Sequence, residues 1–236
     1  MTNKTKLQRA YILHCRPYRE TSLLLDCFTE HDGRVSILAR GLRRNRSPVA
    51  RLFCDYWLGY TGKSELKTLV ELEYAELTHH LHGMALFSGY YLNELLLKLI
   101  EKEAPMTKLW HLYHTTIKQI SYGTKIAPLL REFELGMLDE LGYGFQLDET
   151  RSGEPLNKSK AYIFEFSHGL EPYRDQAITS TMSVYSGAEL LAIQARDWQV
   201  SQSLSAAKRL LSLVIDQLLG GKPLKSRYFA QKLLRK

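Results

Sequence analysis

The sequence lacks long apolar runs, and this absence limits where the protein can act. None of its 236 residues belongs to an uninterrupted apolar stretch as long as the ~18 residues of a membrane-spanning helix. The amino terminus, MTNKTKLQRAYILHCR, also lacks the apolar core of a signal peptide. We therefore expect an intracellular, cytoplasmic protein without a membrane partner.

Cysteine is scarce as well. Cys15, Cys27 and Cys54 are odd in number and have no C-x-x-C spacing. This pattern argues against a disulfide framework and against a zinc knuckle. We expect three small buried thiols in a reduced protein.

The motifs of common enzymes are missing too. The segment TGKS at 61–64 resembles the end of a phosphate-binding loop, but the first glycine of that motif would fall on Trp57. Neither a G-x-S-x-G nor a G-x-G-x-x-G segment occurs. We therefore expect a binding protein that is not an enzyme and needs no cofactor.

Possible metal ligands occur only in small groups. A site would need matching cysteine or carboxylate partners and further groups that hold the ligands by hydrogen bonds, so we predict ordinary surface or helix-end histidines and no bound metal. Glutamates two residues apart in a strand are typical of a solvated sheet face rather than of a nuclease centre. The groups are His79, His80 and His82; His111 and His114; and Glu71, Glu73 and Glu76.

Positive charge is abundant and unevenly placed. The net charge of +7 divides into +4 for residues 1–80, −4 for 81–204 and +7 for 205–236. Between Gly33 and Cys54 there is no acidic residue, but there are six arginines, Arg34, Arg40, Arg43, Arg44, Arg46 and Arg51. Such a surface attracts polyanions, and no basic segment has the apolar face of a membrane-surface helix. We interpret the arginines as phosphate contacts.

Hydrophobic periodicity separates two regions near residue 80. Five short runs rich in β-branched and aromatic residues, with turn signals at Asp32-Gly33 and Thr61-Gly62, predict a small antiparallel barrel of the oligonucleotide-binding (OB) type. The arginines fall between its third and fourth strands. The expected strands are LQRAYILH, SLLLDCFTE, RVSILAR, RLFCDYWLGY and ELKTLVELEYAEL.

From Met84 onward the apolar residues recur at helical spacing. We predict helices over 84–103, 107–121, 128–141, 186–198 and 202–219, the fourth opened by a Ser186/Glu189 capping box. Residues 143–186 are mixed and contain a possible hairpin around KAYIFEF, so we expect a small inserted subdomain. The fold class is therefore α+β, with an OB-type domain at 1–80 and a helical domain at 81–236.

The fourth predicted strand offers aromatic side chains for nucleic acid. Phe53 and Trp57 alternate with Arg51 on one face, while the opposite face should fill the barrel. If the first face is open, its rings can stack with bases beside cations that contact phosphates. The alternative, that a helix covers these rings, stays open at this point.

Several segments resemble the RecO family of bacterial recombination mediators. AYILHCRPYRETSLLLDCFTEHDGRVSILARGLRR is similar to the family's amino-terminal pattern, an R-x-Y-x-E-x-S segment followed by FT, a glycine and a basic A-x-G-x-R stretch. YYLNELL at 90–96, FELGMLDELGYG at 133–144 and GGKPLKSR at 220–227 match further along, in the family's order. The resemblance thus spans nearly the whole chain.

The resemblance implies an OB barrel followed by a helical domain, with no enzymatic active site. It also implies a nucleoid-associated DNA repair protein that binds single- and double-stranded DNA and anneals complementary strands. The implied partners are single-strand-binding protein (SSB), RecR and, indirectly, RecA, which is helped to load onto SSB-coated strands. An RNA-binding OB protein without a repair role is the alternative.

One departure from the family concerns zinc. Many RecO-like proteins have four cysteines after the LGYG helix, but residues 145–186 here contain none. We therefore predict an inserted subdomain that is held together by packing and binds no zinc.

Two further sites are expected in the second region. Basic residues near the carboxyl end predict a second DNA surface, although cations also favour helix ends for structural reasons. By resemblance, Arg131 binds the carboxylate of the acidic SSB tail, with Leu135 and Leu138 on the same helix face; the alternative is an arginine paired with Glu132 or Glu134. The predicted second DNA surface contains Lys208, Arg209, Lys222, Lys225 and Arg227.

Overall fold

The computed structural model describes residues 7–42, 50–76, 80–199 and 201–234. The chain forms two compact units, which we call unit 1 (Met1–Thr124 with Leu224–Lys236) and unit 2 (Lys125–Pro223). Unit 1 therefore contains the barrel together with helices from both ends of the helical region. Among the described helices, none has the length and apolar character needed to cross a bilayer.

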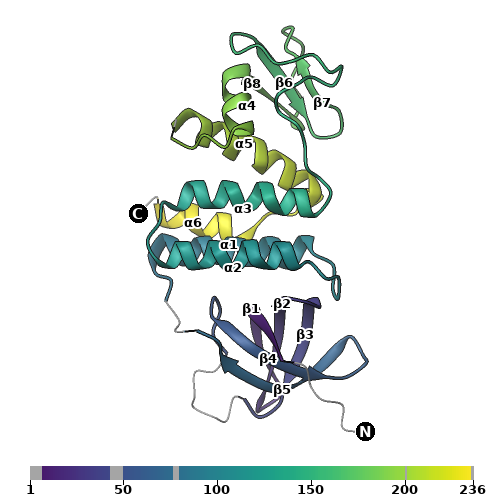
Figure 1. Ribbon diagram of the computed structural model, residues 1–236, viewed down its shortest axis with the longest axis vertical. Coiled ribbons are helices and arrows are strands. Elements are labelled where there is room, and N and C mark those ends of the chain that lie inside the picture. The colour runs from purple at the N-terminus through teal and green to yellow at the C-terminus, as the bar shows by residue number, and fades with distance from the viewer. Residues whose placement is uncertain (1–6, 43–49, 77–79, 200, 235–236) are drawn as a thin grey trace. The chain divides into compact units, whose positions relative to one another are not determined.

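The five predicted strands form a closed barrel in unit 1 (Figure 1). Neighbouring strands follow the order β1-β2-β3-β5-β4, and β4 pairs back with β1 to close the ring. Only the β3–β5 pair is parallel among these strands. This five-stranded Greek-key barrel confirms the OB-type prediction. The strands are β1 (Gln8–Tyr18), β2 (Ser22–Thr29), β3 (Gly33–Ala39), β4 (Asp55–Thr61) and β5 (Leu66–Tyr74).

The barrel interior follows from strand alternation. In β3 the side chains of Val35, Ile37 and Ala39 are buried and contribute to the core, while the residues between them are partly exposed. Tyr56 and Leu58 of β4 are fully buried in the same core, as their predicted strand face requires.

Three helices complete unit 1: α1 (Gly83–Leu99), α2 (Thr107–Ser121) and α6 (Lys225–Leu234). Helix α2 docks on the barrel, where the indole N–H of Trp110 donates to the carbonyl of Phe28 at 3.1 Å. The chain between α1 and α2 passes so close to β3 that a Cβ on Gly33 would lie 1.9 Å from the carbonyl oxygen of Ala104. Gly33 also has a φ of +68°, so this position requires glycine.

The prediction for α1 was wrong at its carboxyl end. The helix ends at Leu99, and Ile100 is already extended, whereas periodicity extended the helix to residue 103. The cause is a tertiary contact, because the guanidinium of Arg34 donates to the carbonyl of Ile100 at 2.9 and 3.2 Å. That carbonyl is satisfied by the barrel, so no further helical turn is needed.

Unit 2 combines helices with a small sheet (Figure 1). The helices are α3 (Ile126–Glu140), α4 (Gly187–Gln194) and α5 (Ser201–Leu218), and the sheet has the order β7-β6-β8. Its strands are β6 (Ala161–Glu165), β7 (Gly169–Pro172) and β8 (Met182–Ser186). The antiparallel β6–β7 pair confirms the hairpin expected around KAYIFEF.

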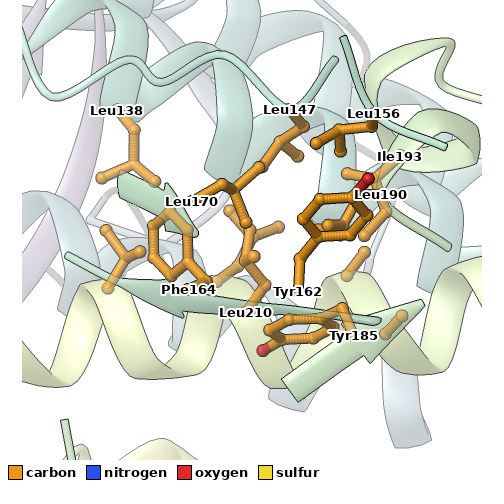
Figure 2. Close-up of a cluster of buried hydrophobic side chains, with 14 residues drawn as sticks. Leu138, Leu147, Leu156, Tyr162, Phe164, Leu170, Tyr185, Leu190, Ile193 and Leu210 are labelled. Carbon is orange, nitrogen blue, oxygen red and sulfur yellow. The ribbon is translucent and has the colours of Figure 1, made fainter. Parts of the chain in front are cut away.

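The inserted sheet has no core of its own. Tyr162 and Phe164 of β6 pack in one buried cluster with Leu190 of α4 and Leu210 of α5, as Figure 2 shows. Burying each such side chain contributes about 1.5–3 kcal/mol. Packing against the helices thus accounts for the order of a segment that contains no cysteine.

The capping box at the start of α4 is confirmed, since Ser186 and Glu189 hydrogen-bond reciprocally. The predicted end of this helix at Trp198 was wrong. Arg196 adopts a φ of +53°, in the left-handed region, and the helix ends at Gln194.

Candidate nucleic-acid interface

The arginine-rich stretch begins at the end of β3. Arg40 directly follows that strand and its side chain is exposed. The described residues resume at residue 50. Arg51 is partly exposed, and its Nη1 lies 3.1 Å from Nε2 of His80. The predicted contacts Arg43, Arg44 and Arg46 lie outside the described residues.

Arg34 has a different role from its neighbours. Its guanidinium donates twice to the Ile100 carbonyl at the end of α1. Arg34 is therefore held within unit 1 through Nε and Nη2. Its phosphate contact stays a prediction, which is tested separately from this structural role.

The aromatic pair does not share one strand face, so this prediction was wrong. Phe53 precedes β4 and has a φ of +64°, which breaks the alternation before the strand begins. The residue is 8% exposed, and helix α1 covers its ring. The Tyr90 ring packs edge-on against it at 5.3 Å, and a Cβ on Gly89 would lie only 2.7 Å from its Cε1. The alternative interpretation, that a helix covers the ring, is thus correct for Phe53.

Trp57 is open to solvent, with 42% of its surface exposed. It pairs across the sheet with Glu73, and Glu71 lies two residues further along β5. Both carboxylates are exposed, as the solvated-face prediction required. The Arg9 guanidinium lies 5.5 Å from the centre of the indole. Trp57 therefore stays a predicted stacking residue, with one cation over its ring and an exposed carboxylate on the neighbouring strand.

An ion-pair network joins the barrel to α2. The Arg9 guanidinium binds the Asp55 carboxylate, with 2.8 Å from Nε to Oδ1, and His114 Nδ1 lies 3.3 Å from the same carboxylate. Glu76 completes the group through Arg9 and Lys118. Burial raises the pKa of Asp55, but hydrogen bonds from Arg9 and His114 outweigh burial and leave that pKa below its usual value.

Oxygen and nitrogen atoms of Asp55, Glu76 and His114 lie close enough together to suggest a metal site. Arg9 already places its positive charge among the two carboxylates. His114 is also held by a 2.9 Å contact of Nδ1 with the Tyr11 hydroxyl and by stacking on Trp110. This arrangement fits structural docking of α2.

The predicted second basic surface is divided between the two units. Lys208 and Arg209 are exposed on α5 of unit 2, where the Arg209 guanidinium lies 3.4 Å from Glu189 and over the ring of Tyr185. Lys225 and Arg227 belong to α6 of unit 1. The predicted second DNA surface thus draws its residues from both units.

The predicted tail contact, Arg131, is not open to solvent. The residue is 7% exposed, and its Nη2 donates to Oε1 of the buried Glu134 at 2.6 Å. This is the pairing that the alternative interpretation anticipated. Leu138 lies in the unit 2 core, and Leu135 packs against that core.

A cleft on unit 2 contains a cation that the sequence reasoning missed. Leu135, Leu138 and Phe145 line it together with Arg196. Arg196 forms ion pairs with Glu132 at 2.5 Å and Asp139 at 3.7 Å. No local pattern reveals Arg196, because it reaches α3 from the end of another helix.

Unit 1 also has an apolar groove that was not predicted, which we call the α1–α6 groove. It is lined by Leu13, Leu52, Phe87, Tyr90, Lys225 and Phe229, among others. Phe87, Tyr90 and Leu97 recur at helical spacing on one face of α1, and this spacing could have been recognised. The contribution of α6 could not, because α6 is more than a hundred residues away in sequence.

Comparisons with known proteins find the same family in both parts of the chain. The amino-terminal domain of recombination protein O matches residues 1–78, and its carboxy-terminal domain matches residues 82–228. The DNA repair protein RecO of Stutzerimonas stutzeri is 43% identical over 220 residues, covering 93% of this chain and 91% of that protein.

Two further relatives have slightly lower identity. RecO of Pseudomonas aeruginosa strain UCBPP-PA14 is 41% identical over 220 residues, covering 93% of this chain and 92% of that protein. RecO of Haemophilus influenzae strain PittGG is 41% identical over 236 residues, covering 98% of both. These matches support a role in DNA repair. The chain belongs to the RecO family of DNA repair proteins.

Proposed function

We propose that this protein is a recombination mediator that binds single- and double-stranded DNA and anneals complementary strands without catalysing bond cleavage. With RecR, it helps RecA load onto DNA coated with SSB. The observation that carries the proposal is the acid-free arginine stretch at one connection of an OB-type barrel in a RecO-family chain.

The mechanism follows from electrostatics. Two DNA strands repel each other, and cations that neutralise phosphates on both lower this cost and raise the local strand concentration. No contact to base edges is required, so sequence preference should be slight. Apart from Arg34, whose guanidinium is held at the Ile100 carbonyl, the proposed phosphate contacts of the stretch are Arg40, Arg43, Arg44, Arg46 and Arg51.

An annealing experiment tests this function. Complementary oligonucleotides, each coated with SSB, are mixed with wild-type protein or with the Arg43→Ala/Arg44→Ala/Arg46→Ala variant, and duplex formation is followed by fluorescence. We expect fast annealing with wild type and slow annealing with the variant. Equal, slow annealing in both, with strong binding to RNA instead, would support the alternative of an RNA-binding protein.

We further propose that the SSB tail binds unit 2 at α3, near Leu135 and Leu138. Arg131 stays the first candidate for the tail carboxylate, but that carboxylate would have to compete with Glu134 for the guanidinium. Arg196 is the second candidate, because it lines the same cleft as the two leucines and is 41% exposed at its side chain.

Two variants separate these candidates. Arg131→Ala and Arg196→Ala are compared for binding of a fluorescent tail peptide and of naked oligo-dT. Selective loss of peptide binding identifies the cation. A loss of peptide and DNA binding together in either variant would mean that the tail site has been misplaced.

A further inference from the structure

The α1–α6 groove is a largely apolar cavity of unit 1, with a volume of about 470 Å³. It lies between Leu13 of β1, the residue Leu52, the Tyr90 face of α1 and the amino-terminal turn of α6. All of these residues belong to one compact unit. The groove therefore lies within unit 1.

Aromatic rings in the groove are exposed to a degree that needs explanation. Tyr90 is 43% exposed and Phe229 is 53% exposed, and both line the cavity together with Phe87. Tyr90 is held in place because its ring packs against Phe53. Large rings are usually buried, so two open ones in a single groove favour a ligand with a flat apolar face.

The polar groups of the groove floor are already satisfied. Glu94 is the carboxylate among the lining residues, and it accepts hydrogen bonds from the backbone N–H groups of Lys225 and Ser226 at 3.0 and 2.8 Å. Lys98 lies 3.8 Å from the same carboxylate. Asn93 donates to the Leu13 carbonyl and accepts from Tyr113. The floor offers a ligand no unsatisfied charge.

A cation lies at the groove's edge. The side chain of Lys225 is exposed there, and His14, whose Nδ1 lies 3.9 Å from Asp26, also lines the groove. Leu52 directly follows Arg51, the last residue of the arginine-rich stretch. Aromatic walls beside cations form the combination that proteins use for single-stranded nucleic acid.

We propose that the α1–α6 groove binds an unpaired base of single-stranded DNA against Tyr90 and Phe229, with a neighbouring phosphate at Lys225. This inference rests on the proposed DNA-binding function and names a base-binding site for it. The groove is a second aromatic surface in addition to Trp57, to which the sequence assigned this role and which pairs across the sheet with Glu73.

The test uses oligo-dT carrying one 2-aminopurine, whose fluorescence falls when the base stacks on an aromatic ring. Binding to the full-length protein is compared for wild type, Tyr90→Ala, Phe229→Ala and Phe229→Trp. Tyr122→Ala is the matched control, because Tyr122 is also in unit 1 and is 61% exposed but does not line the groove. Circular dichroism verifies that each variant is folded.

We expect each alanine variant in the groove to bind roughly 5- to 100-fold more weakly, with less quenching and an unchanged salt dependence. Phe229→Trp should retain binding, and Tyr122→Ala should match wild type. Lys225→Ala should instead make the slope of log affinity against log salt shallower by about 0.7.

Three outcomes would overturn the inference. If wild type binds oligo-dT but the groove variants bind equally well, DNA binding stands and the base site is wrong. If the groove variants keep DNA binding but lose an acidic peptide that ends in an aromatic residue, the groove is a peptide site. If wild type does not bind oligo-dT at any salt concentration, both the site and the proposed function fail.

Discussion

A buried chain of hydrogen bonds links helices α1 and α2 to the barrel, and we predict that it stabilises unit 1. Asn93 of α1 is 2% exposed and donates to the Leu13 carbonyl of β1 at 2.8 Å. The hydroxyl of Tyr113 in α2 donates to Asn93 Oδ1 at 2.5 Å. One amide therefore connects a barrel strand to two helices. Tyr113→Phe removes one of these bonds without changing the packing of the ring.

The expected cost follows from burial. The variant leaves the Asn93 Oδ1 atom inside unit 1 without its donor, and such a group costs about 1–3 kcal/mol. For a chain of this length each kcal/mol lowers the melting temperature by about 2–4 °C, so we expect a decrease of about 2–12 °C. Burial also raises the pKa of Tyr113 well above its usual value, so its hydroxyl keeps its proton throughout the experiment.

The assay is thermal unfolding of a double-mutant cycle with Tyr113→Phe, Asn93→Ala and the pair. In the Asn93→Ala background the hydroxyl has already lost this acceptor, so Tyr113→Phe should cost much less than in wild type. Tyr122→Phe, at an exposed tyrosine, is the control and should change the melting temperature little. An equal cost of Tyr113→Phe in both backgrounds would refute the reasoning.

Two further predictions concern arginines that stabilise unit 1. Arg9→Met should destabilise the protein by about 2–4 kcal/mol at neutral pH, less than for a fully buried pair because the guanidinium is partly exposed. Because the pKa of Asp55 is lowered in the folded protein, the ion pair stabilises the fold at neutral pH, and this stabilisation is lost as the pH falls below about 4. The melting temperatures of wild type and variant should therefore converge in acid. A difference that stays constant with pH would contradict this. Arg34→Met should destabilise the protein by about 1.5–3 kcal/mol, because its bonds to Ile100 are lost, and should leave oligo-dT affinity unchanged. Arg40→Ala should weaken oligo-dT binding without loss of stability. The reverse pattern would show that Arg34 contacts DNA.

The barrel could be predicted from sequence because its signal is local. Alternation in β3 and the turn at Asp32-Gly33 are each contained in fewer than about ten residues. Helix α2 was predicted with its observed bounds, Thr107–Ser121, for the same reason. The Ser186/Glu189 capping box is likewise a pattern of four residues.

The candidate site was harder, because tertiary contacts decide which side chains are available. Nothing near Arg34 in sequence indicates that the Ile100 carbonyl will accept its guanidinium. Phe53 is covered only because a distant glycine, Gly89, lets α1 approach its ring. Arg131 belongs to a residue type that is usually exposed, but it is buried beside Glu134. Charge and aromatic content can be read from the sequence, but their exposure cannot.

The most direct test of the central claim is the salt dependence of oligo-dT binding. The five single-strand phosphate contacts of the arginine-rich stretch contribute about −3.5 to the slope of log affinity against log salt. In the Arg43→Ala/Arg44→Ala/Arg46→Ala variant the slope should be shallower by about 2, with weaker binding at every salt concentration. Unchanged affinity and slope would contradict the account and place the DNA away from the arginine-rich stretch.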